Sequence, residues 1–285
     1  MENIAMIGLG NIGYPIALNL IKANNKLKIA KYKNSESITK LAQEGAIVCS
    51  SFNEAIESCD FLVLALPNAD NIKEILFTNK PKLKEGLVVF DLSTIDLKAS
   101  LEIGAKLKEH DVVYIDSPVS GGVVGAEKGE LTLMVGSTAK EFELLKKILK
   151  PVGKKFIHCG QQGMGLVAKL ANNLIVATQQ VIIGEALAMA KKTEIEIETL
   201  LEVLNNSTSQ SSTLQRKTPN YITDQYAPTF SLELMDKDLK AVIDTATYLN
   251  AETPITDKIK AIFDKAKEKY SQLDSSAVVK YYEKE

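Results

Sequence analysis

Two short stretches of the sequence carry side chains that could act together on a small anion. Lys169 stands near the start of a predicted apolar helix, and Asn173 follows at i+4 on the same helix face. An ammonium group in a partly dry cleft can stabilise negative charge that develops on a carbonyl oxygen and can donate a proton to it. Ser120, Gly121 and Gly122 offer a hydroxyl and unhindered backbone N–H groups, which suit a carboxylate. A solvated surface lysine and a flexible glycine turn are the alternatives.

A glycine-rich turn near the start of the chain has the spacing of a dinucleotide site. Gly8-Leu9-Gly10-Asn11-Ile12-Gly13 follows a predicted strand, residues 3–7, and opens a predicted helix, residues 11–24. The first glycine permits a tight turn, the second lets the backbone approach a pyrophosphate, and the third permits close packing of helix on strand. The helix N-terminus adds N–H groups and a partial positive charge. The turn therefore predicts dinucleotide binding.

The end of the second predicted strand favours NADP over NAD. A sheet of this kind usually carries Asp or Glu there when it binds NAD, because the acid binds the ribose 2′-hydroxyl. Here Lys31 and Lys33 stand in a stretch without an acid, and two ammonium groups can meet a 2′-phosphate. Lysines at strand ends are also commonly solvated, so NAD remains the second choice.

The hydrophobic pattern predicts an α/β fold in which a Rossmann-type doubly wound sheet domain, residues 1–162, precedes an all-α domain, residues 163–285. Up to about residue 160, short apolar runs alternate with longer amphipathic stretches, as in a parallel sheet. Strands are expected at residues 3–7, 27–31, 61–65, 87–91, 112–116, 131–135 and 155–158. The edge that follows residue 116 is where such sheets hold their ligands.

A long helix, residues 166–192, is expected to join the two domains. Its apolar positions run almost all round, which is typical of a helix buried at a domain centre. Further helices are expected at residues 96–109, 196–204, 232–250 and 254–269. Residues 205–212 should form a polar loop.

Composition argues against several classes of partner. The chain has 34 Lys and Arg against 36 Asp and Glu, and a net charge of −2 gives no field to hold nucleic acid or an anionic membrane. The N-terminal residues lack a signal-peptide pattern, and the longest apolar run, residues 61–66, is too short to span a bilayer. Cys49, Cys59 and Cys159 show no CxxC spacing, so no disulfide framework or metal site is expected. We expect a cytoplasmic protein.

Several strings, in this order and spacing, resemble those of the β-hydroxyacid dehydrogenase family over nearly the whole chain. After the glycine turn they are Pro15-Ile16-Ala17-Leu18-Asn19-Leu20, Leu66-Pro67 with Asn71, Asp91-Leu92-Ser93-Thr94, Asp116-Ser117-Pro118-Val119-Ser120-Gly121-Gly122, Gly163-Met164-Gly165, Lys169 with Asn172-Asn173, Phe230, Lys237-Asp238-Leu239 and Ser276-Ala277-Val278. The family has a Rossmann-type domain, a long interdomain helix and an all-α domain. The resemblance implies an NAD(P)-dependent enzyme that moves a hydride between nicotinamide and a small β-hydroxy acid or its semialdehyde or keto acid.

The resemblance also implies roles on the substrate side of the site. Lys169 occupies the place of the family's essential lysine and would be the general acid and base. Ser120, Gly121 and Gly122 occupy its carboxylate-binding segment. Asn173 is expected to bind the substrate hydroxyl or carboxylate, and Asn172, which points elsewhere on the helix, is expected to be structural. Phe230 and Asp238 are further expected substrate contacts.

On the cofactor side, the backbone around Leu66, Pro67, Asn71 and Thr94 should line the dinucleotide channel, with Thr94 near the nicotinamide ribose. Lys237 occupies a place where relatives close over the cofactor. The family's asparagine–arginine pair after the second strand is Lys31-Tyr32 here, and the glycine of its KAG turn is Asn24. These departures leave the cofactor preference open.

Two other functions compete with the dehydrogenase. Related proteins of this architecture reduce imines with a different residue at the lysine position, and a nucleotide sensor would bind NADP(H) without turnover. The joint presence of Ser120, Lys169 and Asn173 argues against both. The loop at residues 209–212, expected to face the substrate, carries no specificity signature. Relatives associate through the helical domain, so a homodimer or homotetramer is expected. Its expected partner is a small-molecule carboxylate substrate.

Overall fold

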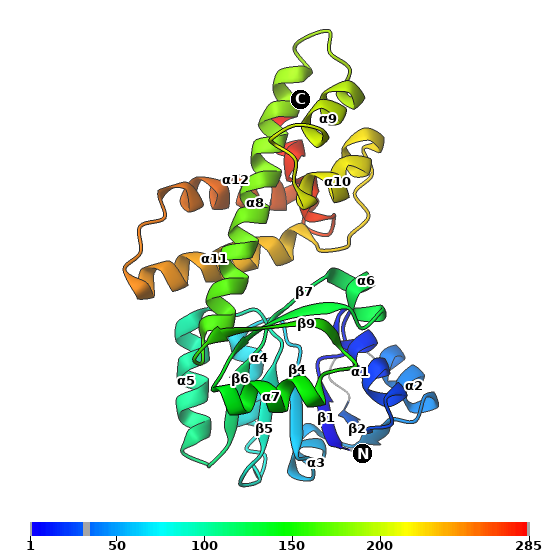
Figure 1. Cartoon of the computed structure of the whole chain (residues 1–285), viewed down its shortest axis with the longest axis vertical. Coiled ribbons are helices and arrows are strands. Elements are labelled where there is room, and N and C mark those ends of the chain that lie inside the picture. Colours follow the sequence, from blue (N-terminus) through cyan, green and yellow to red (C-terminus); the bar gives the residue numbers. More distant parts are fainter. Residues whose placement is uncertain (1, 31–34, 284–285) are drawn as a thin grey trace. The chain divides into compact units, whose positions relative to one another are not determined.

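The computed structural model describes residues 2–30 and 35–283, and the chain divides into two compact units, Met1–Lys169 and Leu170–Glu285. The first unit is a mostly parallel sheet flanked by helices, and the second is built of helices (Figure 1). This order, with the helical part beginning in one long helix, confirms the predicted fold class. Lys31 and Lys33 lie outside the described residues.

One sheet runs through the first unit, and its strand order is that of dinucleotide-binding domains. The order is β3 (Ile47–Cys49), β2 (Lys26–Ala30), β1 (Asn3–Ile7), β4 (Phe61–Leu64), β5 (Val88–Asp91), β6 (Val113–Asp116), β8 (Leu131–Gly136) and β7 (Val119–Ser120), with β9 (Gly153–Gly160) paired to β8. The first six strands in this order are parallel, and β8 then runs antiparallel to β6. The direction in which successive strands are added to the sheet reverses between β1 and β4, and such sheets form a ligand crevice at this point.

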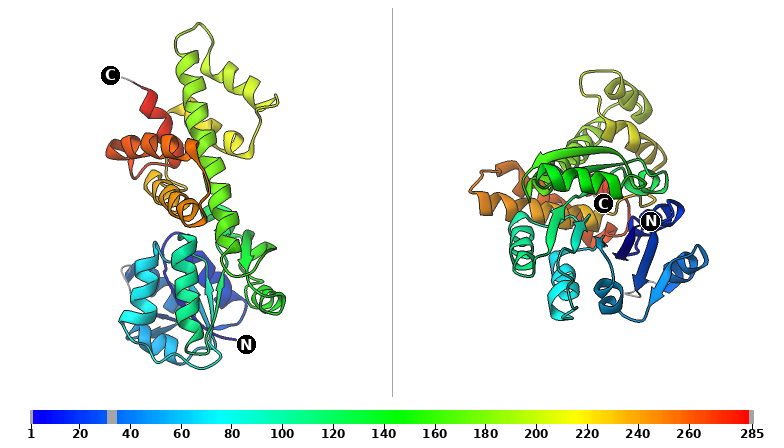
Figure 2. Two further views of the ribbon diagram at one scale, coloured as in Figure 1. Left: turned by 90° about the vertical axis from the view of Figure 1, so that its left-hand side faces the viewer. Right: turned by 60° about the horizontal axis from the view of Figure 1, so that its bottom comes forward.

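Helices pack on both faces of this sheet because alternate strand residues point to opposite sides. Ile4 and Met6 of β1 belong to a core shared with α1 (Gly13–Lys22), α2 (Ser35–Gln43), α6 (Gly122–Glu127) and α7 (Ala139–Ile148). Ala5 and Ile7 belong to a second core with α3 (Phe52–Glu57), α4 (Ala69–Lys73), the π-helix η1 (Glu74–Thr78) and α5 (Leu97–Lys108). Figure 2 shows these helices along the sheet. Each fully buried Ile or Leu side chain stabilises the fold by about 1.5–3 kcal/mol.

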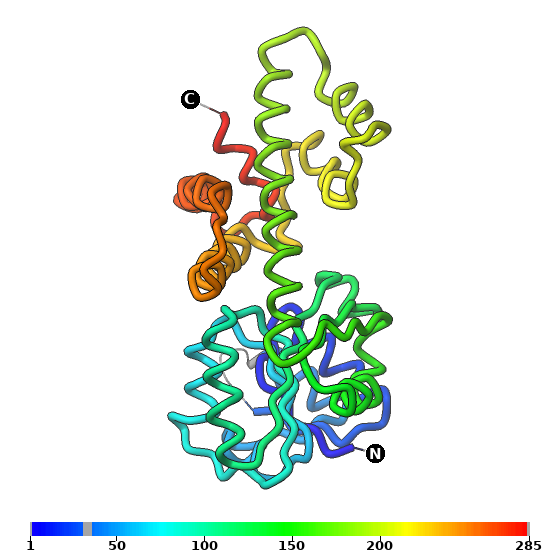
Figure 3. The backbone as a smooth tube through the Cα atoms, turned by 60° about the vertical axis from the view of Figure 1, so that its left-hand side comes forward, coloured from blue at the N-terminus to red at the C-terminus, as the bar shows by residue number. Residues whose placement is uncertain are grey.

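The helical unit is organised around α8 (Met164–Ala190), which Figure 3 shows as an unbroken helix. It is followed by α9 (Ile197–Asn205), α10 (Ser212–Thr223), α11 (Leu232–Leu249), α12 (Pro254–Tyr270) and the 3-10 helix η2 (Ser275–Tyr282). Ala177 and Val181 of α8 pack in one core with Phe263 of α12 and Val278 of η2. The polar loop between α9 and α10 agrees with the predicted loop.

The opposite face of α8 is exposed, so the predicted burial of this helix at a domain centre holds within one chain for one side only. Ile175, Ile182 and Met189, spaced seven residues apart, are 58%, 54% and 73% exposed. Among the described residues, α8 is also the one helix whose length and composition would allow it to cross a membrane, although 44% of its most apolar window is buried inside the protein. Polar residues interrupt the apolar ones along α8, so its long apolar window does not stand out in the sequence as an unbroken run.

Candidate active site

The glycine turn after β1 has the shape that a close phosphate contact requires. Gly8 has φ of +99°, and a Cβ there would lie 2.2 Å from the carbonyl oxygen of Ala65, so the turn touches the end of β4. A Cβ on Gly13 would lie 1.7 Å from the Gly8 oxygen, whereas one on Gly10 would meet nothing within 4 Å. Helix α1 begins at Gly13, two residues later than predicted, because the turn takes up the residues before it. Ile12 at its N-cap has no side-chain acceptor, which leaves this helix end suited to an anion.

The loops after β4 and β5 are joined beside this turn by a chain of hydrogen bonds. The backbone N–H of Leu66 donates to Ser93 Oγ at 2.9 Å, and the N–H of Ser93 donates to Asp91 Oδ1 at 2.9 Å. Tyr114 donates its hydroxyl to Asp91 Oδ2 at 2.6 Å. Burial, and next the negative charge of Asp91, raise the pKa of Tyr114 well above its usual value, so the phenol stays a donor.

The predicted cofactor-channel residues Pro67, Asn71 and Thr94 lie on these same loops. Pro67 is exposed, while Asn71, in α4, and Thr94 are half-buried. The side chain of Asn68 caps α4 by accepting the N–H of Asn71 at 2.9 Å. The structure thus gathers the glycine turn and the Leu66 and Ser93 loops at one edge of the sheet.

The segment after β6 leads into the predicted carboxylate site. Ser120 lies in β7, opposite Thr132 of β8, and Gly121 and Gly122 then open α6. These glycines have φ of +138° and +65°, a region that L side chains rarely adopt. A Cβ on Gly122 would meet nothing within 4 Å, so its backbone is open to approach.

Asp116, the last residue of β6, holds the first turn of α8. Its Oδ1 accepts the N–H of Gly163 at 2.5 Å and its Oδ2 accepts that of Leu166 at 3.0 Å. Asp116 is 1% exposed, and burial raises its pKa to about 7 although these N–H groups oppose the shift. Lys169 follows Leu166 by about one helical turn and is itself buried, at 9% exposure.

Asn173 is held in the helical unit by two side chains. It donates Nδ2–H to Asp238 Oδ2 at 2.6 Å, and its Oδ1 accepts from Asn172 Nδ2 at 3.0 Å. Lys237 Nζ lies 2.7 Å from Asp238 Oδ1. Asn173 and Asp238 are 4% and 2% exposed, and with the half-buried Lys237 they bring three of the predicted positions into one cluster.

Phe230 is held by a different buried group. Asp274 Oδ2 accepts the backbone N–H of Phe230 at 3.4 Å, the hydroxyl of Thr229 at 2.7 Å and Lys217 Nζ at 2.8 Å. The Ser276 hydroxyl donates to Asp274 Oδ1 at 2.7 Å. Burial works against the charge of Asp274, but Lys217, with the Thr229 and Ser276 hydroxyls, holds its pKa below the usual value. Phe230 thus lies in a loop that hydrogen bonds to Asp274 hold just before α11.

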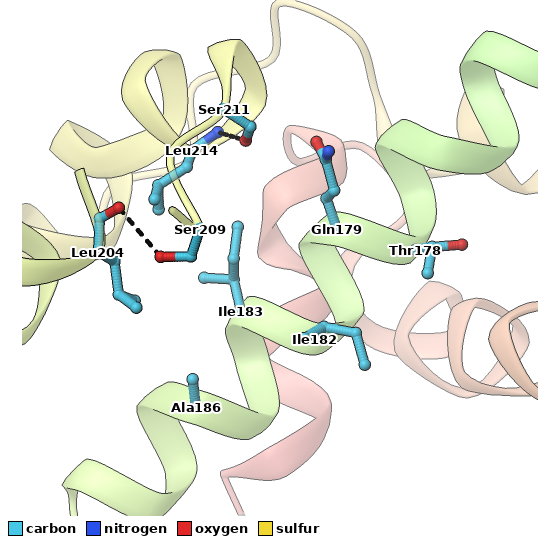
Figure 4. Close-up of a pocket in the computed structure, with 9 residues that line it drawn as sticks. All are labelled: Thr178, Gln179, Ile182, Ile183, Ala186, Leu204, Ser209, Ser211 and Leu214. Atoms are coloured by element: carbon cyan, nitrogen blue, oxygen red, sulfur yellow. Dashed lines mark hydrogen bonds between the residues drawn. The ribbon is translucent and has the colours of Figure 1, made fainter. Parts of the chain in front are cut away.

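The loop at residues 209–212, expected to face the substrate, packs elsewhere within the chain. Ser209 and Ser211 line a pocket with Ile182, Ile183 and Ala186 of α8, and Figure 4 shows these side chains around it. Ile182 lies thirteen residues beyond Lys169, or about 20 Å along a helix that rises 1.5 Å per residue. The loop therefore covers a later part of α8 than the turn that holds Lys169 and Asn173.

Two family models match the chain one after the other. Residues 3–160 match the NAD binding domain of 6-phosphogluconate dehydrogenase, and residues 163–282 match the NAD-binding model of NADP-dependent 3-hydroxyisobutyrate dehydrogenase. The chain belongs to the β-hydroxyacid dehydrogenase family. Its NAD(P)-dependent members act on the CH–OH group of hydroxy acids, and the predicted family is confirmed.

Relatives of this dehydrogenase match it along most of its length. It is 34% identical to the mitochondrial 3-hydroxyisobutyrate dehydrogenase of Drosophila melanogaster, over 89% of this chain and 81% of that one. It is 30% identical to 2-(hydroxymethyl)glutarate dehydrogenase of Eubacterium barkeri, over 98% and 94% of the two chains. The solved structure of Mycobacterium tuberculosis 3-hydroxyisobutyrate dehydrogenase with L-serine has a TM-score of 0.91, 30% identity and 98% coverage of both chains.

Three buried aspartates of this dehydrogenase hold segments that carry predicted site residues, Asp91 and Asp116 in the sheet unit and Asp274 in the helical unit. Asp91 and Asp116 belong to sequence motifs of the family, which assign them no individual role, and Asp274 belongs to none of these motifs. A usable signal exists for the first two, because each ends a buried strand at the ligand edge of the sheet. Asp274 precedes Ser275 and Ser276 at the start of η2, a typical capping arrangement. Among the described residues, no group of three His, Cys, Asp or Glu side chains is placed to hold a metal ion.

Proposed function

We propose that this dehydrogenase interconverts the primary alcohol of a 2-substituted 3-hydroxypropanoate, HOCH2–CH(R)–COO⁻, and the matching semialdehyde. The relatives are named for 3-hydroxyisobutyrate and 2-(hydroxymethyl)glutarate, and one solved relative contains L-serine. These three compounds share that unit and differ in R, which is methyl, carboxyethyl or ammonium. The wider class, a small β-hydroxy acid and its semialdehyde or keto acid, contains it.

Lys169 is the proposed general acid and base. In oxidation its neutral amine takes the proton of the substrate hydroxyl, and in reduction its ammonium returns a proton to the carbonyl oxygen. The nicotinamide, when bound, accepts or supplies the hydride. The observation that carries the proposal is the pair of hydrogen bonds that the N–H groups of Gly163 and Leu166 donate to Asp116. They tie the start of the helix of Lys169 to the strand that leads into the Ser120 segment.

The remaining chain residues bind and orient. Ser120, Gly121 and Gly122 are proposed to take the substrate carboxylate through a hydroxyl and backbone N–H groups. Asn173, one turn after Lys169, is proposed to bind the substrate hydroxyl, and its bonds to Asn172 and Asp238 fix its orientation. Phe230 and Asp238 as substrate contacts, and Lys237 as a cofactor contact, stay predictions from the resemblance.

The decisive experiment compares Lys169→Ala with Lys169→Arg. Either change should lower kcat by about 10²–10⁴, because the alanine has no proton to transfer and arginine keeps its proton at working pH. Binding of NADPH, followed by its fluorescence, should change little. Activity of Lys169→Ala near that of the unchanged protein would remove the proposed acid and base.

A substrate panel separates the competing functions. Oxidation of 3-hydroxyisobutyrate, 2-(hydroxymethyl)glutarate and L-serine is compared with reduction of glyoxylate, succinic semialdehyde and a cyclic imine. Turnover of the imine alone would favour an imine reductase, and cofactor binding without any turnover would favour a sensor. We expect the enzyme to oxidise the hydroxy acids, with kcat/KM values that differ according to the substituent R.

NADP is the proposed preferred cofactor, on the strength of Lys31, Lys33 and the absence of an acid in residues 29–34. The Lys31→Ala and Lys33→Ala variants should each lower kcat/KM for NADP by about tenfold, the equivalent of one lost charged contact of about 1.4 kcal/mol. Values for NAD should stay within a factor of about two. A clear advantage of NAD in the unchanged protein would reverse the assignment.

A homodimer or homotetramer in the cytoplasm is proposed for the assembled enzyme. Ile175, Ile182 and Met189 form an exposed apolar stripe along α8, whereas apolar side chains on a surface usually stand singly. A second copy of the chain could bind to this stripe and bury it. The free thiols of Cys49, Cys59 and Cys159 suit a reducing compartment. Light scattering after gel filtration should show an oligomer, and Ile182→Glu should dissociate it, whereas Lys192→Glu should not.

A further inference from the structure

Two buried aspartates occupy adjacent positions at the ligand edge of the sheet. Asp91 ends β5 and Asp116 ends β6, the two residues are register partners, and both are 1% exposed. Their hydrogen bonds nevertheless run to different parts of the first unit. The difference suggests that they do different work.

Asp91 serves the loops beside the glycine turn. It accepts the N–H of Ser93, and Ser93 Oγ in turn accepts the N–H of Leu66, so one carboxylate ties the loop after β5 to the loop after β4. The residue before Leu66 is Ala65, whose carbonyl lies against Gly8. This chain of contacts ends at the phosphate-binding turn.

Asp116 serves the helix of Lys169. Two glycines make room for its carboxylate, because a Cβ on Gly136 would lie 2.4 Å from Oδ1 and a Cβ on Gly165 would lie 2.8 Å from Oδ2. A third glycine, Gly163, donates its N–H to Oδ1. Both carboxylate oxygens are used by backbone N–H groups at the start of α8. The helix start is therefore held at a fixed distance from the end of β6.

We propose that Asp91 and Asp116 are positioning residues with separable tasks, Asp91 holding the loops that receive the dinucleotide and Asp116 holding Lys169 relative to the Ser120 segment. The second task rests on the proposed role of Lys169. Neither residue needs to touch a ligand, because a displacement of about 1 Å in a reacting group can lower the rate by about 10²-fold. The alternative is that both carboxylates only stabilise the fold.

The test is a comparison of kinetic parameters in Asp91→Asn and Asp116→Asn. Each amide keeps the size of the side chain but replaces one acceptor oxygen by a donor. Asp91→Asn should raise the KM for the cofactor by about tenfold and leave kcat within about threefold. Asp116→Asn should lower kcat by about tenfold or more and leave the KM for the cofactor within about threefold.

Matched variants keep the test decisive if an amide variant does not fold, as judged by circular dichroism. Ser93→Ala removes only the acceptor for the Leu66 N–H and should repeat the cofactor effect in milder form. Asp116→Glu keeps both acceptor oxygens but lengthens the tether, so it should bind cofactor normally with a lowered kcat.

The outcomes are distinct. Equal changes in kcat and cofactor KM in both variants, or lower melting temperatures without a kinetic split, would overturn the proposal and leave these carboxylates as fold stabilisers. Full activity of Lys169→Ala would instead overturn the proposed acid and base. The proposed role of Asp91 would still be tested in that case, because the KM for the cofactor in Asp91→Asn does not depend on the role of Lys169.

Discussion

The sheet unit and the helical unit bury carboxylates in opposite ways. In the sheet unit Asp116 faces the backbone N–H groups of Gly163 and Leu166, and burial raises its pKa to about 7. In the helical unit Asp274, with no exposed surface, faces Lys217, and despite the opposing effect of burial its pKa is lowered. The Asp116 carboxylate positions a neighbouring segment, but its charged form lowers the stability of the fold at neutral pH. The Asp274 carboxylate, paired with Lys217, stabilises the fold at neutral pH.

The largest expected effect comes from breaking the ion pair of the helical unit. Lys217→Met leaves the Asp274 charge buried without its lysine and should reduce the free energy of unfolding by about 3–5 kcal/mol. Urea denaturation followed by circular dichroism measures the change. Lys240→Met is the matched control, because its pair with Asp244 is 65% and 41% exposed, and it should cost less than about 1 kcal/mol. Equal losses in the two variants would show that the buried Lys217–Asp274 pair stabilises the fold no more than an exposed pair does.

An intermediate effect is expected from the neutral donor of the sheet unit. Tyr114→Phe removes the hydroxyl that donates to Asp91 and should lower the free energy of unfolding by about 1.5–3 kcal/mol, the range for a hydrogen bond to a charged group. Tyr281→Phe, at a ring that is 43% exposed, is the control and should be nearly neutral. An unchanged free energy of unfolding in Tyr114→Phe would mean that backbone donors alone hold Asp91.

The smallest expected effect is a dependence of stability on pH. Because the folded pKa of Asp116 is about 7 and its usual value is 3.8, the folded state holds this proton more tightly than the unfolded state does. Stability from this group is therefore full below the usual value and declines as pH rises toward 7, by about 1 kcal/mol between pH 6 and pH 7.

Thermal melts at several pH values measure this decline against Asp116→Asn, whose amide does not titrate. The melting temperature of the unchanged protein should fall relative to that of the variant as pH rises. Asp274 contributes in the opposite sense, since the stability that its lowered pKa provides is present above 3.8 and is lost only as pH falls further. A difference between the two proteins that does not vary with pH would show that Asp116 stays ionised throughout.

The parts of the fold with strong local signals could be predicted from the sequence. The glycine turn, β1 and the long helix α8 are encoded in neighbouring residues, as turn chemistry and apolar periodicity. Strand β3 was missed because it has only three residues, two of them exposed. Helix α10 was missed because its composition is polar, and the 3-10 helix η2 because its place depends on tertiary contacts.

The candidate site shows the same limit. The positions of Lys169 and Asn173 on one helix face followed from their spacing, but the partner of Asn173, Asp238, lies 65 residues away. The Asp116 contact with Gly163 joins residues 47 apart, and the Asp274 contact with Thr229 joins residues 45 apart. Such pairings arise only when distant segments pack together, and no local pattern in one sequence encodes them.

The glycines that surround Asp116 have a consequence for how this enzyme can be altered. Gly136, Gly163 and Gly165 come from two separate segments, yet each leaves space that a methyl group would fill. In a library of single substitutions, these positions and Asp116 should behave as one unit that rejects replacement. Redesign of the enzyme for a new R group is better directed at side chains elsewhere, with this junction between strand and helix left as it is.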